Sequence, residues 1–160
     1  SHQTRWAWRV SYHKKNLSEV NKVETFVTGC SMLIKADVIN KVGLFDERYF
    51  AYFEDSSYCL AVRRAGFKCV CDTRALIYHK ENATSGKNSP FFTYLFSRNR
   101  ILFIKYNFPK IVLLYYYPFF FVKFLYALIH FTLTNQSKRR KDFISGYIDG
   151  VKNRTNYIPI

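Results

Sequence analysis

The chain has 160 residues, of which 49% are hydrophobic and 22% are charged, and its formal net charge is +14. This length suits one domain, or one domain with an appendage, and the apolar content excludes a wholly disordered chain and a disulfide-stapled mini-protein. The charge is uneven, because residues 82–160 carry 12 basic and only 2 acidic side chains. A basic half of this kind favours a polyanionic partner, either nucleic acid or an anionic membrane surface.

The first 24 residues are polar and basic, and they predict an incoming connection with one short strand. The β-branched and apolar residues of 24–35 predict a longer strand, which Gly29 interrupts. A glycine inside a strand marks either a bulge or a place where the backbone approaches a ligand closely. Gly29 is therefore the first candidate site residue.

Two helices are predicted in the next segment, on either side of an aromatic loop at 44–53. Residues 36–42 have an acid early in the run and are followed by Gly43, which is typical of a short helix. Residues 54–66 begin with Glu-Asp-Ser and end with two arginines, an alanine and a glycine, which suits the start and the end of a helix. The aromatic loop therefore leads directly into an acidic first turn.

The pattern changes after the second predicted helix. Residues 67–72 and 75–79 predict two short strands, residues 81–90 predict a loop, and everything from Pro90 onward predicts helix. Of the aromatic residues, 16 lie between positions 91 and 131. The chain is thus predicted to mix strands and helices first and to be helical afterwards.

The four cysteines, at positions 30, 59, 69 and 71, form no Cys-x-x-Cys pair and have no histidine at ligand spacing nearby. This spacing gives a zinc site little support. Cys69 and Cys71 are two residues apart in a predicted strand, so we expect both on one face. The pattern favours buried, reduced thiols of a cytosolic protein.

The most apolar stretch of the chain is 111–133, where Lys123 is the single formal charge. As a helix it would be about 35 Å long, which is enough to cross a bilayer core. Three features argue against a simple span: Lys123 near its middle, Pro118, which would kink a helix, and basic residues on both flanks.

Two basic flanks suit a re-entrant hairpin bent at Pro118, or a helix that lies in the interface of an anionic leaflet. The alternative is a buried helix of a larger soluble domain. Single-strand nucleic-acid binders interleave basic and aromatic residues, whereas here the aromatics cluster and the charges flank them. The sequence therefore predicts contact with an anionic membrane surface and no nucleic acid.

Glu54 and Asp55 are the most suggestive residues for chemistry, because they open a predicted helix. The positive end of a helix dipole keeps carboxylates ionised. An ionised carboxylate at the mouth of a site is what a general base needs in order to deprotonate a hydroxyl. The same pair also suits a helix cap, so both roles stay open.

Further candidates lie later in the chain. His79 ends a predicted strand and leads into a loop rich in Gly, Ser and Asn, where it could meet a metal ion or a phosphate, or simply lie at the surface. Arg98, Asn99 and Arg100 could clamp a diphosphate, or could simply be solvated.

A family resemblance rests on five segments in order: TGCSMLIK, VGLFDERYFAYFED, RRAGFKCVCD, ALIYH and SRNRILF. Together they resemble the C-terminal half of family 2 glycosyltransferases, and in particular the rhamnosyltransferase-like enzymes that build bacterial surface polysaccharides. The resemblance runs from about Thr25 to Lys105, and a weaker likeness continues into FISGYIDGVKNR. The run FDERYFAYFED carries most of its specificity.

The resemblance implies an α/β fold of the GT-A type, in which a Rossmann-like nucleotide-binding half precedes an acceptor half. Residues 1–24 would then be the incoming connection and residues 25–105 the acceptor-side half. Residues 106–134 would form apolar, membrane-associating helices, and residues 135–160 a basic helical tail.

The resemblance also implies roles for single residues. Asp55 matches the catalytic base, which deprotonates the acceptor hydroxyl for direct, inverting attack on the anomeric carbon, and its neighbour Glu54 would contact the acceptor. Gly29 and Cys30 match a glycine loop that borders the acceptor. His79 matches a histidine that reaches the metal or the diphosphate in many GT-A enzymes.

The chain departs from the family pattern in three ways. Ser57 stands where a second acid is common, and Ala61 stands where an arginine is common. No Asp-x-Asp triplet occurs in the 160 residues, although this motif mainly holds the divalent cation, Mg²⁺ or Mn²⁺, in such enzymes. We therefore expect the chain alone to be inactive and to need a missing nucleotide-binding half.

The expected function is transfer of a sugar from a nucleotide-sugar to a polysaccharide or lipid-linked acceptor in bacterial cell-surface glycan synthesis. The expected location is the cytoplasmic face of the bacterial inner membrane, either peripheral or re-entrant. The alternative is a non-catalytic membrane-docking subunit whose partner supplies donor binding, or a remnant that lacks donor binding. A second alternative, a basic nucleic-acid-binding module, rests on charge alone.

Overall fold

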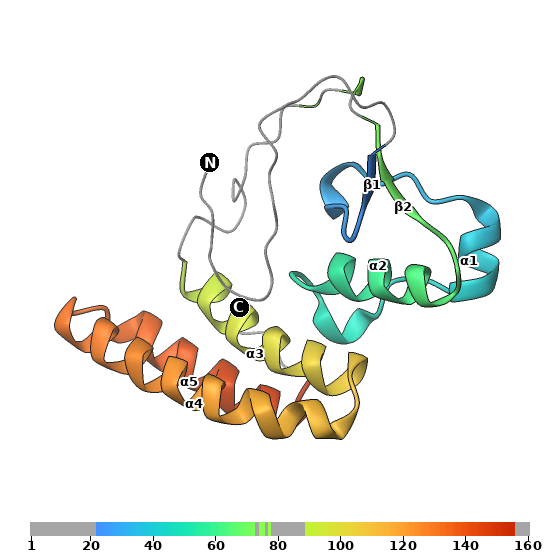
Figure 1. The fold of residues 1–160 in the computed structure, drawn as a ribbon. Coiled ribbons are helices and arrows are strands. Elements are labelled where there is room, and N and C mark those ends of the chain that lie inside the picture. The colour runs from blue at the N-terminus through green and yellow to red at the C-terminus, as the bar shows by residue number, and fades with distance from the viewer. Residues whose placement is uncertain (1–21, 73, 76, 78–88, 156–160) are drawn as a thin grey trace.

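The computed structural model of the chain describes residues 22–72, 74–75, 77 and 89–155. These residues form an α/β mix that is mostly helical (Figure 1). In chain order the elements are β1 (Lys22–Glu24), a 3-10 turn η1 (Gly29–Ser31), α1 (Ala36–Val42), a second 3-10 turn η2 (Glu47–Tyr49), α2 (Glu54–Arg64), β2 (Cys69–Cys71), α3 (Pro90–Asn107), α4 (Lys110–Leu133) and α5 (Ser137–Val151).

One group of elements consists of β1, α1, α2 and β2, which lie together in Figure 1. The two strands pair antiparallel, with Val23 opposite Val70. A small core lies between the sheet and the two helices, and its buried members are Val38, Tyr58, Cys59, Val62 and Cys69. The predicted helices at 36–42 and 54–66 are confirmed, and each is followed by a glycine with positive φ, Gly43 at 88° and Gly66 at 91°.

The strand predicted at 24–35 is wrong beyond its first residue, since β1 ends at Glu24 and a 3-10 turn begins at Gly29. The backbone amide of Gly29 has an alternative partner, because it donates a hydrogen bond to a side chain of α2 rather than to a neighbouring strand. Of the strand predicted at 75–79, the described positions 75 and 77 form none, whereas β2 confirms the strand predicted at 67–72.

The expectation that the thiols are buried is wrong for two of the four cysteines. All four are free, and Cys59 and Cys69 are buried while Cys30 and Cys71 are exposed. The small core reaches β2 only at Cys69, so Cys71 at the far end of the strand lies outside it.

The second group consists of α3, α4 and α5, which lie side by side in Figure 1. Helix α3 begins where Ser89 accepts a hydrogen bond from the Phe92 amide and Pro90 occupies the first turn. Its four consecutive buried residues Ile101–Ile104 form the larger core together with Tyr49 and Phe120, so this turn of α3 is enclosed almost all round. This core therefore joins the loop before α2 to the helices of the second group.

Helix α5 packs so closely against α3 that the backbones of the two helices approach each other at Gly146 and Gly150. A Cβ atom placed on Gly146 would lie 2.2 Å from the Ser97 Oγ and 2.3 Å from the Tyr94 carbonyl oxygen. One placed on Gly150 would lie 2.8 Å from the carbonyl oxygen of Arg98. Only glycine fits at these two positions, because the neighbouring atoms are mainly backbone atoms that cannot rotate away.

Helix α4 is unbroken from Lys110 to Leu133, with Pro118 inside it. The alternative of a hairpin bent at Pro118 is therefore wrong, since the proline removes one backbone hydrogen bond without ending the helix. The chain reverses after α4 instead, where Asn135 takes a positive φ of 53°. Phe124 of α4 then packs on Phe143 and Tyr147 of α5, with ring centroids 5.7 and 4.6 Å apart.

Candidate functional site

The first turn of α2 brings together two residues that the sequence singled out separately. The backbone amide of Gly29 donates a hydrogen bond to Oδ2 of Asp55 at 3.1 Å. The other oxygen, Oδ1, accepts from the Ser56 amide at 2.7 Å and lies 3.3 Å from the Ser56 hydroxyl. Because both oxygens are held, the carboxylate has a defined orientation over the turn at 29–31.

Gly29 contributes its amide rather than its lack of a side chain. A Cβ atom placed on Gly29 would lie 3.6 Å from the Cβ of Asp55, which is an ordinary contact distance. The next residue, Cys30, is exposed, and its sulfur lies 3.0 Å from the Thr28 hydroxyl. The structure thus places Gly29 and Cys30 at the start of a 3-10 turn beside Asp55, 26 residues away along the chain.

Glu54 differs from Asp55 in its surroundings. Burial raises the pKa of the Glu54 carboxyl group, and the neighbouring Asp55 charge adds to this rise. Its Oε2 atom is buried and has no hydrogen-bond partner among the described residues. Burial therefore penalises the charged form of Glu54, and no described residue donates a hydrogen bond to its Oε2 atom to offset this penalty.

A strained loop leads into this turn. Phe50, Tyr52 and Phe53 all have positive φ values, of 63°, 67° and 75°. Such conformations cost on the order of 1–3 kcal/mol each for residues with a bulky side chain, so they persist only where other contacts impose them. Since Phe53 directly precedes Glu54, the loop sets where the first turn of α2 begins.

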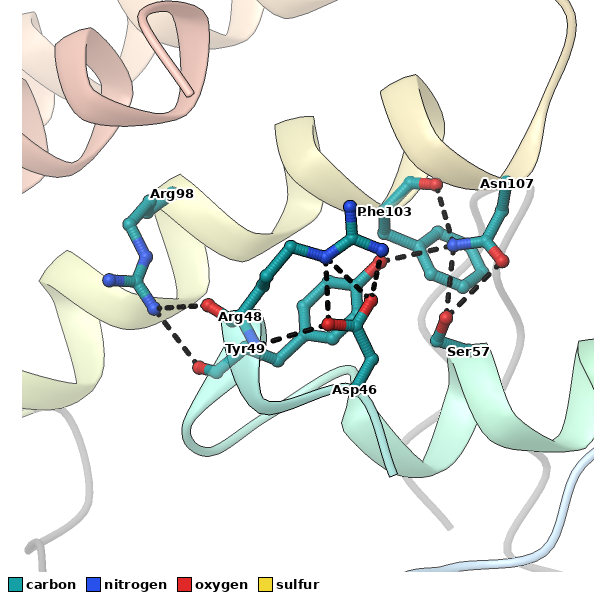
Figure 2. A network of polar contacts seen from close by, with 7 residues as sticks. All are labelled: Asp46, Arg48, Tyr49, Ser57, Arg98, Phe103 and Asn107. Carbon is teal, nitrogen blue, oxygen red and sulfur yellow. Dashed lines mark hydrogen bonds and ion pairs between the residues drawn. The ribbon is translucent and has the colours of Figure 1, made fainter. Parts of the chain in front are cut away.

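Asn99 and Arg98 of α3 impose this conformation. The side-chain amide of Asn99 donates to the carbonyl oxygens of Tyr49, Ala51 and Tyr52 at 2.8, 2.7 and 2.8 Å. Arg98 Nη2 donates to the carbonyl oxygens of Arg48 and Tyr49 at 3.2 and 3.0 Å, as Figure 2 shows. Both side chains are fully buried, so the alternative that they are solvated is wrong; their contact with phosphate stays a prediction.

A second set of polar contacts extends from this loop to the end of α3 (Figure 2). Asn107 Nδ2 donates to the Tyr49 hydroxyl at 3.0 Å and to the Ser57 hydroxyl at 3.1 Å. Ser57, at the position where the resembling family often has an acid, is buried. Through its hydrogen bond with Asn107, Ser57 instead joins α2 to α3. The sequence alone did not identify Tyr49 and Asn107 as members of this network.

Asp46 and Arg48 lie at the solvent side of the same loop. Three hydrogen bonds run from the Arg48 side chain to the Asp46 carboxylate, and the shortest is the 2.6 Å ion pair from Nη2 to Oδ2. Asp46 also accepts from the Arg48 amide, which starts η2. Burial alone would raise the pKa of Asp46, but the hydrogen bonds from Arg48 lower it overall. The Asp46 carboxylate therefore stabilises the conformation of the loop through its bonds to Arg48.

The remaining candidates lie elsewhere. Arg100 lies over the ring of Phe120, 5.1 Å from its centroid, and is not in contact with the loop through any described bond. His79 lies outside the described residues. Within the part of the chain that the structure describes, no three His, Cys, Asp or Glu side chains gather closely enough to hold a metal ion.

Comparison with known proteins finds one kind of relative. Over 81 residues, 51% of this chain, the sequence is 27% identical to the N-acetylglucosaminyl-diphospho-decaprenol L-rhamnosyltransferase of two Mycobacterium tuberculosis strains, CDC 1551 / Oshkosh and ATCC 25618 / H37Rv. The match covers 26% of those proteins, so the chain spans about a quarter of the length of the curated relatives it matches. No family model and no solved structure matches. The similarity supports a glycosyltransferase-like relationship.

Proposed function

We propose that this chain is the acceptor-side part of an inverting glycosyltransferase of family 2 with a GT-A fold. It would move a sugar from a nucleotide-sugar to a polysaccharide or lipid-linked acceptor in bacterial cell-surface glycan synthesis. The observation that carries the proposal is the hydrogen bond between the Gly29 amide and the Asp55 carboxylate, which orients an acid at the start of a helix. The distant similarity to a rhamnosyltransferase supports the reaction class.

In this proposal Asp55 is the general base. It accepts the proton of the acceptor hydroxyl while the hydroxyl oxygen forms its bond to the anomeric carbon of the donor sugar. The bond from that carbon to the nucleoside diphosphate breaks on the opposite side, so the configuration inverts. A carboxylate oxygen that already accepts one amide hydrogen bond still has a lone pair for this proton. Base catalysis of this kind is worth about 10²–10⁴-fold in rate.

The neighbouring side chains would serve the acceptor. Glu54, the neighbour of the proposed base, would contact an acceptor hydroxyl. Gly29 and Cys30 would border the acceptor, since they form the turn against which the Asp55 carboxylate lies. Arg98 and Asn99 would act indirectly by holding the loop that leads into α2.

Donor binding is proposed to lie in a nucleotide-binding half outside these 160 residues. Enzymes of this type use Mg²⁺ or Mn²⁺ to offset the charge of the departing diphosphate. The described residues of this chain do not fit such a site, because they hold no cluster of potential ligands and the sequence has no Asp-x-Asp triplet. No step of the mechanism above is assigned to the metal.

Helix α4 is long and apolar enough to be membrane-associated, with 24 residues and about 36 Å of length. Little of it is buried, and its exposed apolar residues are Ile111, Leu114, Tyr115, Tyr117, Phe121, Val122, Leu125, Tyr126, Ile129 and Leu133. We propose that this face lies against the anionic cytoplasmic leaflet of the inner membrane. The cluster Lys138–Lys141 at the start of α5 would contact lipid headgroups.

The catalytic proposal is tested in an enzyme that joins this chain to a nucleotide-sugar-binding half. Asp55→Asn should lower the transfer rate by about 10²–10⁴-fold, because the amide cannot accept the proton. The melting temperature should fall only modestly, since the asparagine oxygen keeps one of the two backbone hydrogen bonds and its NH₂ group loses the other. Glu47→Gln, an exposed acid in the preceding loop, is the matched control and should keep near-normal rate. An Asp55→Asn enzyme with near-normal rate would show that this acid only caps the helix.

Gly29 allows a second test of the same contact. Gly29 is the first residue of η1, and the preceding Thr28 has an extended backbone with ψ of 145°, so proline fits there. Gly29→Pro removes the amide donor to Asp55, whereas Gly29→Ala keeps it. We expect about a tenfold or greater loss of rate for the proline variant only. Equal rates for the two variants would contradict the orienting role of the amide.

Membrane association is tested with vesicles. The purified chain should co-sediment with vesicles that contain phosphatidylglycerol, and high salt should weaken this binding because it screens the flanking charges. Phe121→Ser, on the exposed face of α4, should weaken binding without changing stability, and Ser145→Ala on α5 is the control. If vesicle binding changed neither with salt concentration nor in the Phe121→Ser variant, the proposed contact face would be wrong.

A further inference from the structure

A cavity of about 110 Å³ lies between α3 and α5. Its α3 wall is a single helical face that includes Phe92, Phe96 and Arg100, and its α5 wall consists of Arg139 and Phe143. The volume is far larger than the roughly 10–15 Å³ that one water molecule requires. No carboxylate is among the residues that line the cavity, so its charged groups are two cations set in aromatic walls.

Arg100 is a half-buried cation without an ion-pair partner among the described residues. Burial lowers the pKa of its guanidinium, and the Nε atom is buried without a hydrogen-bond partner in the described part of the chain. None of the ion pairs between described residues includes Arg100. Partial burial of this charge is destabilising unless an anion offsets the lost hydration, and the contact with the Phe120 ring offsets it only in part.

Arg139 approaches the same cavity from α5. Its Nε donates to the Thr93 hydroxyl at 3.3 Å and its Nη1 donates to the Gln136 side-chain oxygen, while Nη2 makes no hydrogen bond to a described residue. Rings of α4 lie against both arginines, Phe120 at 5.1 Å from Arg100 and Phe131 at 5.0 Å from Arg139. Stacking of this kind fixes the plane of a guanidinium and leaves its N–H edge for a ligand.

We infer that this cavity binds a phosphate-class anion between the guanidinium groups of Arg100 and Arg139. Two planar forks of N–H donors match the oxygens of a phosphate or diphosphate group, and a desolvated setting strengthens such charge-assisted hydrogen bonds. The anion would supply the counter-charge that Arg100 lacks. The aromatic lining and the exposed apolar face of the adjacent α4 also admit an anion that carries a lipid tail.

The cavity is one aromatic layer away from the first turn of α2. The ring of Phe96 lies 5.2 Å from that of Phe53, and the ring of Phe92 lies 5.0 Å from that of Tyr52. The rings of Phe92 and Phe96, which line the cavity, therefore also contact the loop that leads to Asp55. The inference does not rest on the proposed transfer reaction, since it follows from the two arginines and is tested by binding alone.

The test is titration calorimetry on the full chain in a neutral detergent, with sodium pyrophosphate as the probe and sodium chloride at matched ionic strength as the blank. We expect saturable binding of one pyrophosphate per chain. Arg100→Met and Arg139→Met should each weaken it at least tenfold. Lys152→Met removes the same charge from an exposed position just after α5, outside the cavity, and should change affinity less than twofold.

A second arm identifies the source of the phosphate. Phosphatidic acid and phosphatidylcholine are each added to the same micelles. Phosphatidic acid that binds at least tenfold more tightly than pyrophosphate, with the same dependence on Arg100 and Arg139, identifies a lipid headgroup. Pyrophosphate that binds more tightly than phosphatidic acid identifies a soluble phosphate, and comparable affinities identify a site that takes both.

The melting temperature of each variant, measured without ligand, is the control that shows whether the variant folds. Arg100→Met should not lower it, because methionine has a similar length and removes a half-buried charge that has no ion-pair partner among the described residues. Arg139→Met, on the other wall of the cavity, keeps the test independent of any effect that substitution of Arg100 has on folding. The inference is overturned if neither probe gives saturable binding to the folded chain, or if all three variants weaken binding equally.

Discussion

In the described part of the chain, the core of the β1–α1–α2–β2 group has five buried side chains, whereas α3 alone buries eleven residues. The first group also leaves large apolar side chains in the open, with Leu33 at 98% and Leu44 at 78% exposure. In the second group the exposed apolar side chains gather on α4, and the interior of α3 includes Arg98, Asn99 and Asn107.

The comparison shows that the candidate site depends on both groups in different ways. The first group supplies the residues that would touch substrate, Gly29, Glu54 and Asp55, on a part of the chain with a small core. The second group supplies the side chains that hold them, because the amides of Asn99 and Asn107 reach across to the loop and to α2. The candidate site residues thus lie on the group with the smaller core, and the more heavily buried helix α3 holds them in place.

The largest expected effect is in the second group, at the contact between α3 and α5. Gly146→Ala should destabilise the chain by about 3 kcal/mol, because the new methyl group would meet the Tyr94 backbone at 2.3 Å. Unfolding in urea measures this difference. Ser145→Ala, on the exposed side of the same turn, should cost less than about 0.5 kcal/mol. Equal effects at the two positions would show that the helices pack loosely.

The next largest effect on stability is expected at Asn99, which connects α3 to the loop before α2. Asn99→Leu should cost about 2 kcal/mol, since the carbonyl oxygens of Tyr49, Ala51 and Tyr52 lose their shared donor. Amide hydrogen exchange should accelerate at 50–55 while residues 101–104 keep their protection. Asn40→Leu on the exposed face of α1 is the control. Unchanged exchange at 50–55 would mean that the loop holds its strained conformation by itself.

The smallest effects are two opposite dependences of stability on pH. Hydrogen bonds from Arg48 lower the pKa of Asp46 despite its partial burial, so its contribution is present above the ordinary value of 3.8 and is lost as pH falls through the folded-state pKa. Burial raises the pKa of Glu54, so its ionisation lowers stability as pH rises above 4.5.

Matched amides separate these two contributions. At pH 7 Asp46→Asn should destabilise the chain and Glu54→Gln should stabilise it, each by no more than about 1 kcal/mol because both groups are partly solvated. Both differences should shrink as the pH falls, that of Glu54→Gln towards pH 4.5 and that of Asp46→Asn below pH 3.8, because the carboxyl groups become protonated. Melting temperatures of the three proteins between pH 2 and 7 measure this, and a shift of the same sign for both variants would contradict the assigned environments.

The sequence by itself determined the elements that local signals mark. Helix α1 and helix α2 end near Gly43 and Gly66, and α2 begins with Glu54 and Asp55, because glycine, acidic and basic residues act within one turn of a helix end. Asp55 and Gly29 were also found from the sequence, each from its own neighbours. Their contact was not predicted, because 26 residues separate them and the resemblance gave each of them only a role towards the acceptor.

Only the tertiary structure decided where the polar residues of α3 go and how α4 runs. A local window does not show that the donors of Asn99 meet three carbonyl oxygens almost 50 residues earlier, so solvation was a reasonable alternative from sequence. Pro118 is a kink signal, yet α4 continues through it and packs Phe124 on α5. The physical reason is common to these cases: propensity acts between neighbours in sequence, whereas desolvation and hydrogen-bond pairing depend on partners that only the folded chain brings near.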